Sequence, residues 1–97
     1  MTNCYNAGKI GDLSKEVWEA KFKQARAEIL KMRFNPICPT ELPHNHGRSW
    51  GEYMREDLTA MLSCDAVYAQ RDWEDSPGAT IEVNLAIQLG IPVYYQP

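Results

Sequence analysis

The sequence predicts an α/β fold, because strand-like and helix-like segments alternate along a chain of 97 residues. Short β-branched and aromatic runs are separated by longer segments in which apolar residues recur every three or four positions. This alternation favours a parallel sheet with helices on both faces. We therefore expect a small three-layer fold of the flavodoxin or Rossmann type, with four to five parallel strands in a single domain over residues 1–97.

The first part of the chain is expected to hold a strand, a glycine-containing loop and a long helix. Residues 2–6 are strand-like, and two glycines in residues 7–11 would let backbone amides approach a ligand closely. Ser14 is a plausible N-cap for a helix that runs to about Met32. One face of this helix carries an apolar stripe with the spacing of a packed surface: Trp18, Phe22, Ala25, Ile29 and Met32.

The middle of the chain predicts a brief strand, a loop and a second helix. Residues 33–37 can hold only a short strand, because a proline closes it or places it at an edge. Residues 38–48 are expected to be a loop, since prolines, an asparagine and a glycine interrupt them. Ser49 followed by Glu52 forms a capping box, which predicts a helix starting at Trp50.

The last part of the chain predicts a strand, a polar loop, a third helix and a final strand. Residues 66–69 are strand-like and residues 70–75 are polar. Ser76 is the expected N-cap of a helix with proline at its first position and a glycine at its end. Residues 91–95 then supply the last strand.

Two acids lie on helix faces that are otherwise apolar. Glu82 falls near the middle of a broad arc formed by Ile81, Val83, Leu85, Ala86, Ile87 and Leu89, and Asp57 shares an arc with Trp50, Tyr53, Met54, Leu58, Met61 and Leu62. Burial of an ionised carboxylate is costly, so two such positions indicate a functional site. Burial would raise the pKa of Glu82, whereas the helix dipole would lower it. As structural alternatives, Glu82 could pair with an arginine or cap loop amides, and Asp57 could orient a loop.

A ligand site is expected at the carboxyl edge of the sheet, where three segments meet. They are the loop Gly8–Gly11, the polar loop 70–75 and the start of the third helix. Ser76 and the amides of Gly78 and Ala79 could cradle a phosphate or a sugar hydroxyl, or Ser76 could be only a cap. Trp73 is expected to be exposed and could stack on a base, or it could cover the helix end.

Composition excludes several classes of function. A net charge of −3 leaves no basic surface for a nucleic acid polymer, and no apolar run is long enough to span a membrane. No secretion leader is visible, and the odd number of cysteines, Cys4, Cys38 and Cys64, favours free thiols, so we expect a cytoplasmic location. His44 and His46 follow Cys38 in the predicted loop, but three or four convergent ligands would be needed for zinc. We expect no metal and no organic cofactor.

The order of the motifs resembles one small, largely uncharacterised family common in phages and bacteria. That family is related to nucleoside 2-deoxyribosyltransferases and to 2′-deoxynucleoside 5′-phosphate N-hydrolases. The resemblance covers nearly the whole chain and rests on these segments: Tyr5-Asn6-Ala7-Gly8-Lys9-Ile10, Asn35-Pro36, Ser49-Trp50, Tyr53-Met54-Arg55-Glu56-Asp57-Leu58, Cys64-Asp65-Ala66-Val67, Trp73-Glu74-Asp75-Ser76-Pro77-Gly78-Ala79 and Glu82.

The resemblance implies a role for each matching residue. Glu82 would be the nucleophile that attacks the anomeric carbon of a deoxyribose, and Asp57 the acid that assists departure of the base or holds the sugar. Ser76 and Gly78 would take the 5′-hydroxyl or 5′-phosphate. The first-strand loop would lie along the nucleoside through Tyr5, Ala7, Gly8, Lys9 and Ile10.

The resemblance also implies a homodimer or larger homo-oligomer in which a neighbouring subunit completes the pocket. The helix carrying Trp18 and Phe22, or the second helix, could supply that interface. Two features depart from the family pattern. Many relatives carry Gly-Pro where this chain has Gly8-Lys9, and the sequence alone does not identify the tyrosine that positions the nucleophile.

The favoured hypothesis is an enzyme that cleaves an N-glycosidic bond or transfers a deoxyribosyl group through Glu82. Such cleavage passes through a cationic sugar, which a carboxylate stabilises or traps covalently, and a second carboxyl of raised pKa can protonate the departing base. The alternative is a nucleotide-binding protein without turnover, for instance one that sequesters a nucleotide signal. A third possibility is a structural or oligomer-forming remnant without a ligand.

Overall fold

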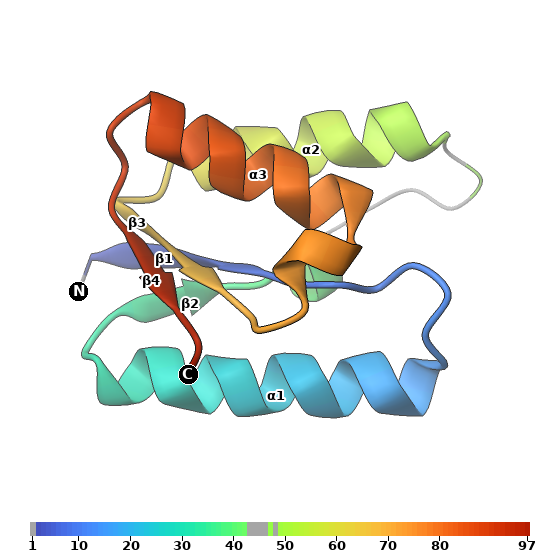
Figure 1. The fold of residues 1–97 in the computed structure, drawn as a ribbon, viewed down its shortest axis with the longest axis horizontal. Helices are drawn as coiled ribbons and strands as arrows, with labels where there is room; N and C mark the ends of the chain where they lie inside the picture. Colours follow the sequence, from blue (N-terminus) through green and yellow to red (C-terminus); the bar gives the residue numbers. More distant parts are fainter. Residues whose placement is uncertain (1, 43–46, 48) are drawn as a thin grey trace.

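The computed structural model describes residues 2–42, 47 and 49–97, and its centre is a parallel four-stranded sheet (Figure 1). The strand order is β2-β1-β3-β4, and each neighbouring pair is parallel. The strands are β1 (Asn3–Ala7), β2 (Asn35–Ile37), β3 (Ala66–Ala69) and β4 (Val93–Tyr95). The predicted α/β class and parallel sheet are therefore confirmed, with four strands in the described residues.

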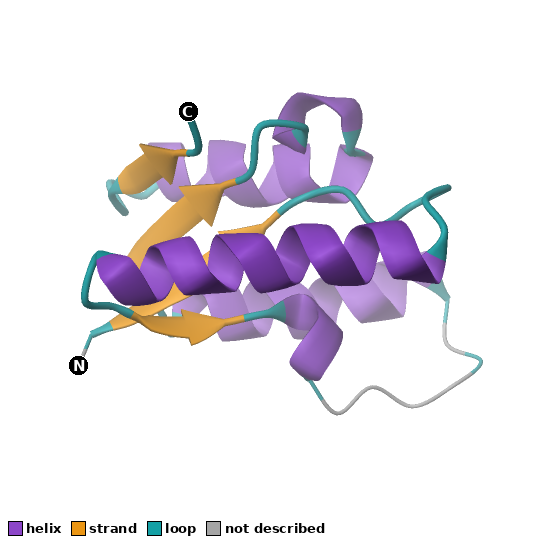
Figure 2. Cartoon of the chain, turned by 90° about the horizontal axis from the view of Figure 1, so that it is seen from below, coloured by secondary structure: helices purple, strands orange, loops and turns teal. Residues whose placement is uncertain are grey.

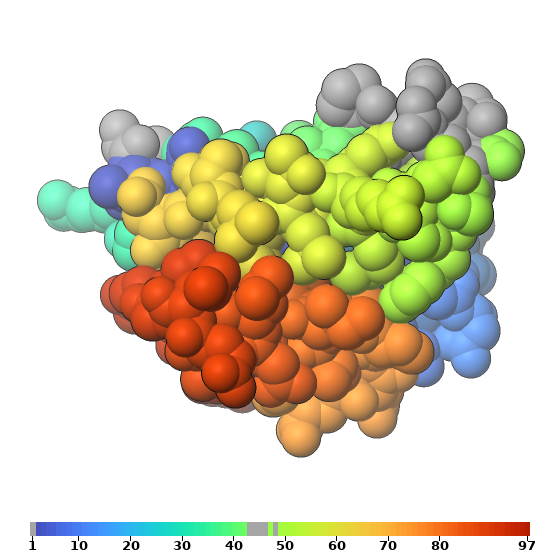
Figure 3. Space-filling view, turned by 90° about the horizontal axis from the view of Figure 1, so that it is seen from above, coloured from blue at the N-terminus to red at the C-terminus, as the bar shows by residue number. Residues whose placement is uncertain are grey.

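Helices cover both faces of the sheet and make the fold three-layered. Helix α1 (Lys15–Lys31) lies on one face, while α2 (Trp50–Leu62) and α3 (Pro77–Gln88) lie on the other (Figures 1 and 2). A view onto the second face shows α2 and α3 side by side (Figure 3).

Local capping explains where the helices begin. Ser14 accepts a hydrogen bond from the Val17 amide at the start of α1, and Ser49 and Glu52 form the predicted capping box of α2. Ser76 caps α3 by accepting from the Ala79 amide at 3.1 Å. All three predicted helix starts are confirmed.

Four details of the secondary structure differ from the sequence-based expectation. Short 3₁₀ helices occupy Pro39–Glu41 (η1) and Trp73–Asp75 (η2), within segments expected to be irregular, because i to i+3 bonds close each turn. Strand β2 starts at Asn35, since Arg33 takes a left-handed φ of 66° that interrupts an extended chain. Strand β4 starts after Pro92, which has no N–H to donate to a ladder.

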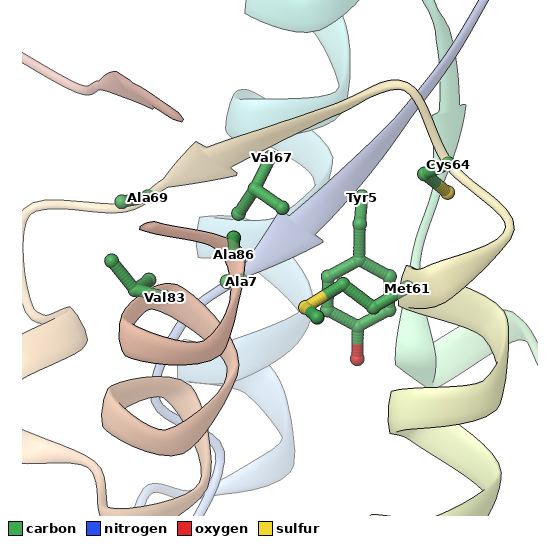
Figure 4. Packing of buried hydrophobic residues seen from close by; sticks show 8 residues of the cluster. All are labelled: Tyr5, Ala7, Met61, Cys64, Val67, Ala69, Val83 and Ala86. Carbon is green, nitrogen blue, oxygen red and sulfur yellow. The ribbon is translucent and has the colours of Figure 1, made fainter. Parts of the chain in front are cut away.

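The core has one cluster on each side of the sheet. Side chains alternate along β1, so Cys4 packs against α1 while Tyr5 and Ala7 face α2 and α3. The cluster under α2 and α3 consists of Tyr5, Ala7, Met61, Cys64, Val67, Ala69, Val83 and Ala86 (Figure 4). The cluster under α1 consists of Cys4, Ala25, Ile29, Ala66 and Tyr68.

The predicted apolar arc of α3 is broader than the face that the helix buries. Its buried residues are Ala79, Glu82, Val83 and Ala86. Ile81, Ile87 and Leu89 are 42%, 51% and 56% exposed, so these members of the predicted arc lie outside the buried face. A helix lying on a sheet buries only the side turned toward the strands. Glu82 remains inside that narrower buried face.

Candidate active site

A cavity of about 250 Å³ opens where β1 ends and where α2 and α3 begin. These ends meet at the same side of the molecule, at the carboxyl edge of the central strands (Figure 1). The described residues that line it are Gly8, Ile10, Gly11, Pro39, Trp50, Tyr53, Met54, Asp57, Ser76, Pro77, Gly78, Ala79 and Glu82. The structure thus brings Glu82 and Asp57, which come from different helices, to one cavity.

Glu82 is a buried carboxyl with a defined partner. It is 4% exposed, and the Tyr5 hydroxyl donates a hydrogen bond of 2.6 Å to its Oε2 atom. Burial raises the pKa of Glu82 to about 8, the Tyr5 hydrogen bond acts in the opposite direction, and the charge of Asp57 adds to the rise. Desolvation therefore outweighs the hydrogen bond from Tyr5, which favours the charged form.

Tyr5 lies behind Glu82 and outside the lining of the cavity. Its ring is fully buried beside Met61, between the α2 and α3 ribbons (Figure 4). Burial and the charges of Glu82 and Asp57 raise the pKa of Tyr5, so its hydroxyl stays protonated and remains a donor. The sequence analysis expected Tyr5 to lie along the nucleoside; in the structure its hydroxyl contacts Glu82 from outside the described lining of the cavity.

Asp57 shares the cavity and influences its electrostatics. Its Oδ1 atom is shielded from solvent, and its charge contributes to the raised pKa values of both Glu82 and Tyr5. Two carboxyl groups in one partly apolar cavity disfavour the doubly ionised state, which is why the charge of Asp57 raises the pKa of Glu82.

Five of the predicted substrate-binding residues line the cavity. They are Gly8, Ile10, Ser76, Gly78 and Ala79. The Ser76 hydroxyl also accepts from the Ala79 amide, which confirms its role as a cap and leaves it on the cavity wall.

Three other predicted residues lie elsewhere. Ala7 is fully buried in the core, and the Lys9 ammonium lies 3.2 Å from the Asp12 carboxylate. Trp73, expected to be exposed, is half-buried with its ring centroid 6.1 Å from that of Tyr95. Its side chain packs against the core cluster under α2 and α3, and its stacking on a base stays a prediction.

The sequence analysis missed an aromatic part of the wall formed by Trp50 and Tyr53, together with Met54. These residues precede Asp57 by seven, four and three positions, so they share its side of α2. The sequence analysis placed them on one arc with Asp57 but did not assign them to the ligand site. Trp50 is in fact 58% exposed, at the start of the helix.

No group of three possible metal ligands was found in the part of the chain that the structure describes. His44 and His46 lie outside the described residues, and Cys38 is buried. Within the same described part, no helix is long and apolar enough to cross a membrane.

Two of the solved structures with a similar architecture are 2-deoxyribosyltransferases. One from Leishmania mexicana is 22% identical with a TM-score of 0.71, and the match covers 98% of this chain and 63% of that one. One from Bacillus psychrosaccharolyticus is 19% identical with a TM-score of 0.67, over 96% and 70% of the two chains. A conserved protein from Enterococcus faecalis is 22% identical with a TM-score of 0.68, over 98% and 62%.

These matches establish a nucleoside 2-deoxyribosyltransferase-like fold. This chain spans about two thirds of the length of the solved proteins. The chain itself belongs to the family described as Domain of unknown function (DUF4406), whose model matches residues 2–95. No curated protein matches it.

Proposed function

We propose that this protein cleaves the N-glycosidic bond of a 2′-deoxynucleoside or its 5′-monophosphate, with Glu82 as the nucleophile. The observation that carries the proposal is a buried glutamate on a cavity wall, held by a tyrosine 77 positions away in the chain. A carboxyl placed in this way is desolvated and oriented, which favours reaction with a cationic sugar carbon.

The reactive form of the site carries its proton on Asp57 and leaves Glu82 ionised; because the pKa of Glu82 is raised, this form is the less populated one at pH 7. The bond between C1′ and the base nitrogen breaks, its electron pair leaves with the base, and Asp57 gives its proton to that base. A new bond forms between a carboxylate oxygen of Glu82 and C1′. Water, deprotonated by Asp57, then attacks C1′ and breaks its bond to Glu82, whose carboxylate leaves with the electron pair, and this completes hydrolysis. Attack by the nitrogen of a second base, which gives its proton to Asp57, breaks the same bond and completes deoxyribosyl transfer.

The other walls of the cavity suit the rest of a nucleoside. Trp50 and Tyr53 offer aromatic surface for a base, and Ser76 and Gly78 offer polar groups for the 5′ end of the sugar. At about 250 Å³ the cavity is near the lower end of the range for small-molecule sites, so it suits a single nucleoside rather than a polymer. Assembly into a homo-oligomer stays a prediction from the family resemblance.

One observation favours a second candidate, a nucleotide-binding protein without turnover. With a pKa of about 8, only about a tenth of Glu82 would be ionised at pH 7 in the free protein. A neutral carboxyl can donate a hydrogen bond to a bound sugar or base without attacking it.

Base release distinguishes the two candidates. The protein is incubated with the four common 2′-deoxynucleosides and their 5′-monophosphates, and free base is measured by chromatography. We expect release by the wild type, at least about 100-fold slower release by Glu82→Gln, and wild-type release by Glu74→Gln, which removes an exposed carboxylate outside the cavity lining. Nucleotide binding with no base release by the wild type would instead support the second candidate.

A further inference from the structure

A part of the cavity wall is held in place by residues that do not line it. Gly8, Ile10 and Gly11 of the loop after β1 form this wall, and their position depends on contacts to the opposite side of the loop. Those contacts come from the loop after β3 and from the first half of α1. The residues that make them, Asp72 and Lys21, are not among the described residues that line the cavity.

Asp72 and Lys21 together bind the backbone of the loop at Lys9, one at its amide and the other at its carbonyl. The Lys9 amide donates to Asp72 Oδ1 at 3.2 Å, and the Lys21 ammonium donates to the Lys9 carbonyl at 2.8 Å. Lys21 and Asp72 are in turn joined to each other, with Nζ 2.9 Å from Oδ2. The donor and the acceptor of the Lys9 backbone are thus both held by one ion pair.

This ion pair is better shielded than the other pairs in the described residues. The side chains of Lys21 and Asp72 are 23% and 24% exposed, whereas those of Lys15 and Glu19 are 77% and 53% exposed. The Lys21 ammonium also lies 5.1 Å from the centroid of the Phe22 ring, which is buried. A partly buried charged pair with further hydrogen bonds is stronger than an exposed pair on a helix surface.

Gly8, the neighbouring residue of the loop, packs tightly against the buried side-chain amide of Gln70. A Cβ atom added to Gly8 would lie 2.4 Å from Cδ of Gln70, and Gln70 itself is fixed by a 2.8 Å hydrogen bond to Asn6. Asn6 and Gln70 are 0% and 2% exposed. The loop is therefore rigidly supported at Gly8, and its remaining freedom begins at Lys9, where the ion pair acts.

We propose that the Lys21–Asp72 pair is a positioning pair that holds the loop 8–11 against the cavity so that a nucleoside can bind. This inference rests on the proposed function for the identity of the ligand, but the restraint on the loop follows from the contacts alone. Without the pair, the loop must be ordered at the moment of binding, so affinity falls while bond cleavage by Glu82 is unaffected.

The test uses two disrupting variants, one rescue and one control. Asp72→Asn removes the charge of one partner, and Lys21→Met removes that of the other. Lys21→Arg keeps the charge and is expected to behave as the wild type. Lys15→Met breaks the exposed Lys15–Glu19 pair on the same helix and serves as the matched control.

The first measurement is amide hydrogen exchange of the segment 8–13, without a ligand. Both disrupting variants should exchange about tenfold faster there than the wild type, while the rescue and the control stay unchanged. Exchange rates equal to those of the wild type in both disrupting variants would overturn the proposal.

The second measurement is steady-state base release with the deoxynucleoside or deoxynucleotide that the wild type cleaves fastest. Both disrupting variants should raise KM about tenfold and change kcat less than about threefold, and combining them should add little, because they remove one shared contact. A fall in kcat with KM unchanged would refute a positioning role in binding. If the wild type releases no base from any substrate, the proposed function fails, and the exchange rates alone decide whether the pair restrains the loop.

Discussion

The burial of Glu82 predicts a large pH dependence of stability, which Glu82→Gln should abolish. Glutamine cannot ionise, and its side-chain oxygen can still accept the hydrogen bond from Tyr5. The variant therefore keeps the shape and the tyrosine contact of the site and removes only the titration.

The sign follows from the direction of the pKa change. Folding raises the pKa of Glu82 from 4.5 to about 8, so the folded protein holds a proton that the unfolded chain releases. The stabilising effect of that proton is complete below pH 4.5 and is lost as the pH rises through 8. At about 1.4 kcal/mol per pH unit, the wild type should lose about 4 kcal/mol between pH 5 and pH 9 relative to Glu82→Gln.

Urea unfolding monitored by tryptophan fluorescence measures this difference at pH 5, 7 and 9. The free energy of unfolding of a small domain starts at about 5 kcal/mol, so the expected loss is a large part of it. The urea concentration at the midpoint of wild-type unfolding should therefore fall markedly at pH 9. Glu74→Gln, at an exposed carboxylate, should follow the wild type at each pH. If the free energies of unfolding of the wild type and Glu82→Gln changed with pH in parallel, to within about 1 kcal/mol, ionisation of Glu82 would not destabilise the fold. That result would refute the burial argument.

Two further predictions concern residues that the structure places next to the site. Tyr5→Phe removes the hydrogen-bond donor that lowers the pKa of Glu82. In a pH–rate profile, the rise of base release should therefore move to higher pH, and kcat should fall by about tenfold or more. An unchanged profile would contradict the role of Tyr5. Gly8→Ala should lower the free energy of unfolding in urea by about 1–3 kcal/mol, because the added methyl group meets the Gln70 amide. The control Gly51→Ala, in α2, meets only Ser49 Oγ at 4.0 Å and should raise that free energy by about 0.5 kcal/mol. Equal effects would argue against a tight contact at Gly8.

Much of the fold could be predicted because its signals are local. The capping residues Ser14, Ser49 and Ser76 each accept from an amide three positions away, and each starts a helix where expected. Helical periodicity also identified Glu82 and Asp57 as acids on mainly apolar faces. The errors in detail, such as η1 and η2, lie in single turns whose hydrogen bonds are weak signals in a sequence.

Which residues meet at the site could not be predicted from local sequence, because they come from segments that are far apart in the chain. Tyr5 meets Glu82 only because β1 lies beneath α3 in the assembled sheet, and the alternation of side chains along β1 turns its ring to that face. Trp50 and Tyr53 could equally have packed into a core, and only the positions of α2 and the loop 8–11 leave a cavity beside them.

Periodicity within one helix or strand therefore identified which residues are unusual, while the residues they meet were set by packing between distant segments. The Lys21–Asp72 pair joins α1 to the loop after β3 and depends on the parallel pairing of β1 with β3. Helix and strand signals extend over a few residues, but contacts across 50 to 80 positions exist only once hydrophobic burial has fixed how the three layers lie together.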